Sequence, residues 1–288
     1  MKTTIKNRIE YNEDRLLRKK IPNILIQYGN KNKYVLSTFL YLYMNCNREG
    51  VITISIEELA KRTTGNTLDK RTMHLKEYRE ALSLMMEDND DFSTLIHINR
   101  LKIGMDSENK GNYTQEEVFK KIINNWNGDY NKVYPPITPE EIKDKTKVKD
   151  REPLEIRFQI KDNDIQDAYT SLQYDEYNYL TLANIWYGAY MHNLDTQMLF
   201  NIYMYIKMIY CRNSAIKIKK PGEPEVSKIT KSTFKIISNH TGCSNKGASN
   251  YCDILEGLGL ITMEKRVING ENKPTIFYLS DKWKQRTE

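Results

Sequence analysis

The chain has 288 residues, of which 39% are hydrophobic, 10% aromatic and 28% charged. This supply of core-forming residues excludes an intrinsically disordered protein, and the length favours two domains over one. The formal net charge is +6, with two basic blocks, 1–110 and 176–288, around a mildly acidic middle, 111–175. Such a distribution suits two polyanion-binding modules on a spacer, although a charge of this size is equally compatible with ordinary solubility.

Several classes of protein are excluded by what the sequence lacks. No apolar run reaches the roughly 18–20 residues of a membrane span, and none follows the N-terminus as in a signal peptide. There is no phosphate-binding loop, no G-x-G-x-x-G and no G-x-S-x-G, and no two of the four histidines share a metal-binding spacing. We therefore expect a cytoplasmic protein that has no membrane partner, is not an enzyme and needs no cofactor or metal.

The first predicted elements are three helices and a hairpin. A Tyr-rich helix spans about residues 33–46, and a short helix follows from the N-cap Ser55, where Glu58 completes a capping box. Gly65 ends this short helix, and a longer helix around Tyr78–Leu82 comes next. Residues 95–103 are then predicted to be extended and to form a β-hairpin, called here the first wing.

The segment 104–153 is predicted to be an insertion. It contains an amphipathic helix over 114–126 and a second helix that opens at Thr138–Glu141. Residues 143–151 are nearly all charged, which predicts a solvated helix or linker. Apolar and polar residues alternate over 154–160, so we expect a half-buried strand that returns to pair with the first wing.

The second part of the chain repeats the pattern of the first. Leu40–Met44 corresponds to Ile202–Ile206, within a helix over about 195–212. A short helix over Thr230–Thr241, ended by Gly242, corresponds to the one that begins at Ser55. Tyr78–Leu82 corresponds to Tyr251–Leu255. Three matches in the same order, each on an element of the same type, predict a duplicated fold.

Each copy is predicted to contain a helix, a short helix, a glycine turn, a longer helix and a hairpin. This is the plan of a winged helix-turn-helix domain. In the second copy, Asn269–Gly270 supplies the hairpin turn. We therefore predict a mainly α chain with small β wings (α+β) and two such domains in tandem: residues 1–165, with the insertion at about 104–153, and residues 166–288.

Helical periodicity separates the inward faces of the two third helices from the faces that could meet DNA. The residues predicted to pack inward are Leu75, Tyr78, Leu82, Met85, Ala248, Tyr251, Cys252 and Leu255. The residues predicted to contact DNA are Lys70, Arg71, Thr72, Lys76, Lys231, Lys235, Asn245, Lys246, Ser249, Asn250, Lys265 and Arg266. Lysine and arginine suit phosphates, whereas hydroxyl and carboxamide groups suit base edges. The alternative is that these are ordinary surface residues.

The second copy is more basic than the first. Residues 196–252 hold nine basic and two acidic residues, whereas residues 56–91 hold six basic and nine acidic ones. Attraction to phosphates therefore predicts that the second copy carries more of the DNA affinity.

Two winged helices in one chain of this length resemble the replication initiators of low-copy, theta-replicating plasmids. Ile21–Asn23 before the Tyr-rich helix and Ile52–Ala60 after it are similar to initiators of Gram-positive plasmids, and the resemblance covers about 20–103 and 178–280. It implies binding of double-stranded DNA at origin repeats to initiate plasmid replication. It also implies a homodimer and a replicative helicase or helicase loader as partners.

Two other functions fit the same pattern. One is a transcriptional regulator of a phage or mobile element, which these residues do not separate from an initiator. The other is a protein-interaction adaptor of the primosome or helicase-loader type. An adaptor should lack a focused basic patch around its third helix, and the second copy has one.

Overall fold

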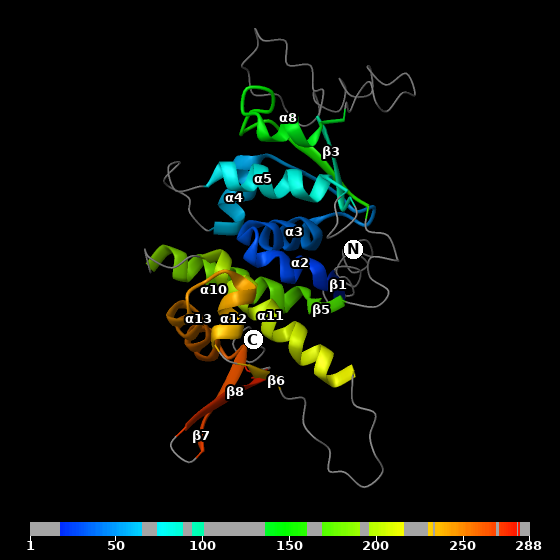
Figure 1. Cartoon of the computed structure of the whole chain (residues 1–288). Helices are drawn as coiled ribbons and strands as arrows, with labels where there is room; N and C mark the ends of the chain where they lie inside the picture. Colours follow the sequence, from blue (N-terminus) through cyan, green and yellow to red (C-terminus); the bar gives the residue numbers. More distant parts are fainter. Residues whose placement is uncertain are drawn as a thin grey trace, which may run out of the picture.

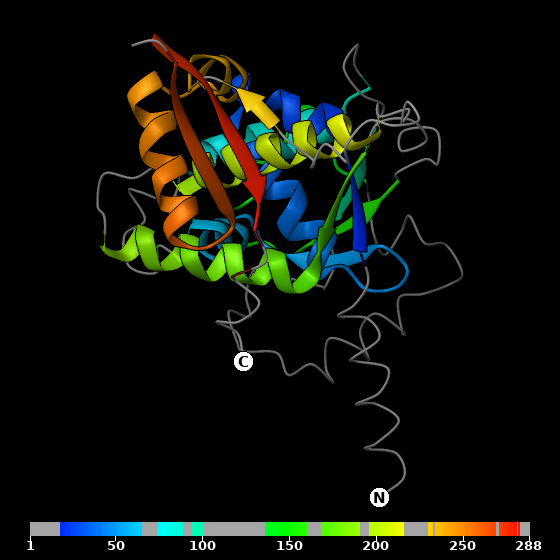
Figure 2. The ribbon, with the colours of Figure 1, turned by 90° about the horizontal axis from the view of Figure 1, so that it is seen from below.

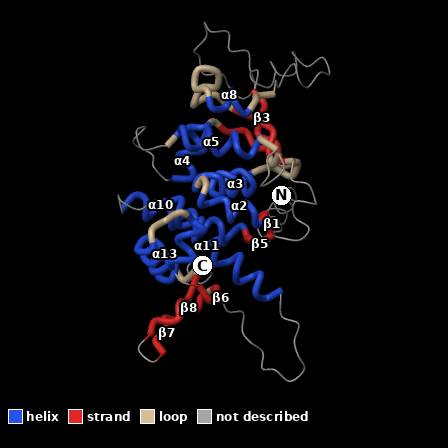
Figure 3. The backbone as a smooth tube through the Cα atoms, in the orientation of Figure 1, coloured by secondary structure: helices blue, strands red, loops and turns tan. Residues whose placement is uncertain are grey.

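The computed structural model describes residues 18–64, 74–88, 94–100, 136–159, 169–190, 196–215, 230–232, 234–268, 271–280 and 282. Within them the chain combines helices with three small antiparallel sheets, which agrees with the predicted α+β class. Helices form the middle of the molecule, and the strands lie around them (Figures 1 and 3).

The elements of the first half, in chain order, are β1 (Arg18–Pro22), α2 (Asn23–Gln27), the 3-10 helix η1 (Tyr28–Asn30), α3 (Lys33–Asn45), β2 (Val51–Ile54), α4 (Ile56–Thr64), α5 (Leu75–Met86), β3 (Ile96–Arg100), α8 (Pro139–Lys143) and β4 (Leu154–Phe158). Those of the second half are β5 (Tyr169–Gln173), α10 (Tyr174–Tyr190), α11 (Thr196–Ala215), β6 (Thr230–Ser232), α12 (Phe234–Thr241), α13 (Asn245–Gly257), β7 (Ile261–Ile268) and β8 (Glu271–Leu279).

The two halves repeat one order of elements. After β1 or β5, each half contains in order a long helix (α3 or α11), a strand, two helices and two final strands, with α2, η1 and α8 as additional elements in the first half and α10 in the second. The three-stranded sheets have the orders β2-β4-β3 and β6-β8-β7, so both place the last strand in the middle. The predicted repeat follows this order, because Tyr41 lies on α3 and Tyr203 on α11, while Tyr78 lies on α5 and Tyr251 on α13. Matched sequence motifs therefore lie on matched elements.

The two halves are joined through equivalent elements. β1 pairs antiparallel with β5, and Lys20 stands opposite Ser171 at the centre of the pairing. α11 packs against α3 of the first half as well as α12 and α13 of the second (Figure 2). Buried apolar side chains of both halves form one continuous cluster. The predicted boundary at 165/166 lies outside the described residues, and the two halves share a core.

The predicted start of the short helix in the second half is wrong by four residues. Thr230–Ser232 forms β6, in which Lys231 stands opposite Ile276 of β8, and α12 begins only at Phe234. A hydroxyl-rich segment resembles a helix N-cap locally, but pairing with β8 satisfies its backbone groups instead. Lys231 therefore lies on a strand and not on a helix.

The strand predicted to return to the first wing is confirmed. β4 lies between β2 and β3 and pairs antiparallel with both of them. Residues 101–135, which include the predicted helix over 114–126, lie outside the described residues. The predicted helix at Thr138 is confirmed as α8, and its capping box joins Thr138 to Glu141.

Residues 143–151 are named here the lysine loop; apart from Lys143, which ends α8, they form neither a solvated helix nor a linker. Arg79 of α5 is 4% exposed, and its guanidinium donates to the carbonyls of Ile142 and Val148, both at 2.7 Å, and to the Asp150 carboxylate at 2.6 Å. Val148 is fully buried. The buried arginine satisfies carbonyls that lack secondary-structure partners, so the loop is ordered without being helical.

Glu57, at the start of α4, also holds this loop and makes stability depend on pH. Its carboxylate accepts from Arg151 Nε at 2.8 Å and from Lys61 Nζ at 2.9 Å. These hydrogen bonds, that of Arg151 first, lower the pKa of Glu57 from 4.5 to about 2. The unfolded chain keeps the higher pKa, so the stabilisation is present above pH 4.5 and is lost as the pH falls towards 2.

We therefore expect Glu57→Gln to be less stable than the parent at pH 7 but to lose less stability on acidification. Urea unfolding at a series of pH values between 7 and 2 measures this difference. Parallel stability curves for the two proteins would show that Glu57 does not act in this way.

Candidate nucleic-acid interface

Four of the residues predicted to contact DNA lie at the start of α13. Gly242 ends α12 with a φ of +76°, a conformation that favours glycine, and thereby turns the chain towards α13. Ser244 is the N-cap that the sequence predicts, because its side chain accepts from Gly247 N at 3.0 Å. The helix therefore begins at a defined residue and in a defined direction.

The two faces of α13 are as predicted from helical periodicity. The residues predicted to pack inward are buried, namely Ala248, Tyr251, Cys252 and Leu255. Asn245, Lys246 and Asn250 are exposed, and Ser249 is half-buried. Four of the predicted DNA-contacting residues therefore lie together on the first half of one helix.

The hairpin that follows α13 extends from the body of the molecule (Figure 1). Gly259, with a φ of +74°, leads the chain from α13 into β7. β7 pairs with β8 from Ile261 opposite Leu279 to Ile268 opposite Glu271, so the predicted turn residues 269–270 join them but lie outside the described residues. The pairing slips by one residue near Pro274, where the missing N–H is tolerated.

Lys265 and Asp253 connect the hairpin to the second half of α13. Lys265 Nζ lies 3.4 Å from Asp253 Oδ1, and both side chains are more than half exposed. Asp253 follows Asn250 along the exposed face, so a carboxylate stands where phosphate would otherwise approach. The electrostatics therefore favour contact at Asn245–Asn250, with Lys265 compensating Asp253. Arg266 lies on β7, next to Lys265.

The basic residues predicted on the short helix lie on two elements. Lys235 is exposed in the first turn of α12. Lys231 belongs to β6, three residues before α12 begins. The structure thus places both at the entry to α12.

The predicted interface of the first half is less favourable. Lys70, Arg71 and Thr72 lie outside the described residues. Lys76 is 86% exposed on α5, but its Nζ lies 3.8 Å from Glu80 Oε1. α8 packs on α5, where Ser83 donates to the Pro139 carbonyl at 3.0 Å. The second half of α5 is therefore partly covered by the segment that contains α8.

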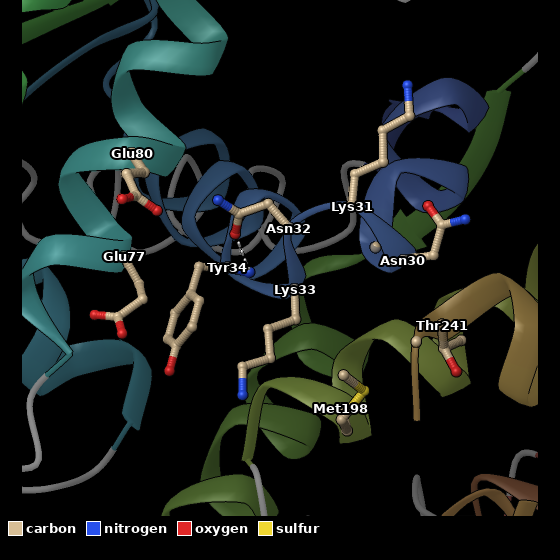
Figure 4. A pocket seen from close by; sticks show the side chains of 11 residues that line it. Asn30, Lys31, Asn32, Lys33, Tyr34, Glu77, Glu80, Met198 and Thr241 are labelled. Atoms are coloured by element: carbon tan, nitrogen blue, oxygen red, sulfur yellow. Dashed lines mark hydrogen bonds between the residues drawn. The ribbon is translucent and has the colours of Figure 1, made fainter. Parts of the chain in front are cut away.

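A pocket separates α5 from the turn that precedes α13. Figure 4 shows Glu77 and Glu80 projecting from α5 on one side, with Lys33 and Thr241 on the other. A Cβ at Gly242 would lie 3.4 Å from Asn30 Cα, so the turn approaches η1 closely. The first half thus supports the turn that positions α13, while two carboxylates, Glu77 and Glu80, line the pocket on the side of α5.

Two other features, a membrane-spanning helix and a metal-binding cluster, are absent from the described part of the chain. None of its helices has the length and apolar character to cross a membrane. No three histidine, cysteine or acidic side chains gather within it to hold a metal ion. Cys252 is buried, and burial raises the pKa of its thiol.

Comparison of the whole chain with protein-family models, with curated proteins and with solved structures gives no match.

The contacts that order the lysine loop are not predictable from local sequence patterns. The one local feature that marks this segment is a basic residue at every second position, namely Lys143, Lys145, Lys147, Lys149 and Arg151. Their neighbours in space, Arg79 and Glu57, lie 60 or more positions earlier in the sequence, so no local pattern connects them.

Proposed function

We propose that each half is a winged helix-turn-helix domain and that the chain binds double-stranded DNA through the second half. The observation that carries the proposal is the exposed start of α13. There Asn245, Lys246, Ser249 and Asn250 share a face whose opposite side is anchored in the core. Side chains of these types at the start of a helix suit the major groove, and in this proposal the β7–β8 hairpin, which follows α13, contacts the adjacent backbone.

The biological role that we propose is initiation of plasmid replication by binding to origin repeats. It rests on the repeated order of elements, on the sheet orders that the halves share, and on the resemblance to plasmid initiators stated above. A homodimer and a replicative helicase or loader belong to the same proposal. No catalytic step by this chain forms part of it.

Binding measured with variants of the second half tests the proposal. The target is first selected from a random library, and each variant is then titrated with that site and with a scrambled duplex at several salt concentrations. Asn250→Ala should cost about 1–3 kcal/mol on the selected site only, because it removes one interaction with a base edge. Lys231→Ala with Lys235→Ala should weaken both duplexes alike and lower the salt slope by about one unit per lost contact.

Lys76→Ala is the comparison in the first half, because it removes an exposed lysine from α5, the helix that corresponds to α13. It should leave both affinities close to those of the parent. If Lys76→Ala abolishes binding while the Lys231 and Lys235 replacements have no effect, the proposal names the wrong half.

A further inference from the structure

The lysine loop is a cationic surface that the proposed interface on α13 does not include. Lys145, Lys147 and Lys149 are all exposed, and Lys145 is 78% exposed. Val148, between the last two, is fully buried and anchors the backbone. Three cations at every second position are thus presented by a loop that is fixed to the first half.

The acidic residues of this region are occupied by structural contacts. Asp150 accepts from the buried Arg79, and Glu152 lies 2.9 Å from Arg100 Nε. Asp144 accepts from the backbone and hydroxyl of Thr146, at 2.8 and 2.7 Å, and so shapes the turn. Residues 143–152 therefore hold five basic and three acidic residues, and the three carboxylates point to structural partners.

The lysines, by contrast, make few such contacts. Lys145 Nζ is 3.7 Å from Asp150 Oδ2, a carboxylate that already pairs with Arg79 at 2.6 Å. The described residues provide no ion pair to the side chains of Lys147 and Lys149. Exposed ammonium groups on an anchored backbone are suited to binding phosphates. A phosphate contact requires a positive charge nearby but no fixed bidentate geometry.

We propose that the lysine loop is a second contact for the DNA backbone, with Lys145, Lys147 and Lys149 on phosphates. The inference rests on the proposed function and deepens it. Figure 1 places α8 and the loop beyond it at one end of the molecule and the β7–β8 hairpin at the other. The loop should therefore act on DNA that extends well beyond the part seated on α13.

The test compares duplexes of about 15 and about 45 bp, which span one and a half and more than four helical turns, with the α13 target site at one end. Lys145→Ala, Lys147→Ala and Lys149→Ala are combined in one variant. We expect it to bind the short duplex as the parent does and the long one at least tenfold more weakly. The salt slope on the long duplex should fall by about two to three units, at about 0.9 per contact.

Lys20→Ala, Arg48→Ala and Lys282→Ala, combined, form a control matched in charge, because all three residues are exposed and lie outside the loop. This control should bind both duplexes like the parent. Should the triple loop variant lose its fold, as judged by thermal melting, Lys147→Gln with Lys149→Gln repeats the comparison with a smaller change.

Three outcomes overturn the inference and leave the proposed function standing: loop variants equal to the parent on both duplexes, loop variants equally weak on both, or a control as weak as the loop variants. The α13 replacements would still lower binding of the short duplex in each case. If the parent binds neither duplex, the proposed function and this inference fail together.

Discussion

Replacing Arg79 with alanine is expected to lower the free energy of unfolding by about 3–5 kcal/mol. The guanidinium is almost completely buried and satisfies two carbonyls and one carboxylate. Its removal leaves Asp150 without its closest cation and the carbonyls of Ile142 and Val148 without donors, each of which has a desolvation cost.

Urea unfolding of Arg79→Ala measures the loss, and limited trypsin digestion shows where it acts. Because Arg79 anchors the lysine loop, cleavage after Lys145, Lys147 and Lys149 should become much faster than in the parent. Lys76→Ala, on the same helix but exposed, is the control and should change stability by less than about 0.5 kcal/mol. Unchanged unfolding and unchanged cleavage in Arg79→Ala would disprove the anchoring role.

Replacing Lys207 with alanine is expected to have an effect of similar size in the second half. Lys207 on α11 and Glu176 on α10 are both buried, and Lys207 Nζ lies 2.5 Å from both carboxylate oxygens. Tyr203 donates to the same carboxylate. Without the lysine, Glu176 is a buried charge whose remaining donors, the Tyr203 hydroxyl and the backbone N–H of Gln173, are both neutral, so we expect a loss of about 3–5 kcal/mol.

A double variant shows whether the fold requires the charges of Lys207 and Glu176 or only side chains that fill the same space. Glu176→Leu alone and Lys207→Met alone each leave one buried charge, and both should destabilise the fold. Combined, they replace the pair by apolar side chains, which is often neutral or stabilising. We expect urea unfolding to show the double variant more stable than either single one. A loss equal to the sum of the two single losses would contradict this account.

Much of the candidate interface could be predicted from local patterns. The four inward residues of α13 follow from a spacing of 3.6 residues per turn, which acts within one helix and needs no knowledge of its neighbours. Ser244, Gly242 and the capping box of Thr138 were also predictable, because caps and positive-φ turns involve residues at most a few positions apart.

Local sequence patterns predicted α3, α4, α5, α8, α11 and α13, the caps at Thr138 and Ser244, the buried face of α13 and the repeated order of motifs, whereas α2 and α10 were not predicted. Only the tertiary structure decided that Thr230–Ser232 is a strand, that β1 meets β5, and that Arg79 orders the lysine loop. The physical reason is the distance along the chain between the partners. Helical contacts join residues three or four positions apart, whereas these pairings join residues about 45 to 150 positions apart, and the energy that favours them comes from groups that no local window contains.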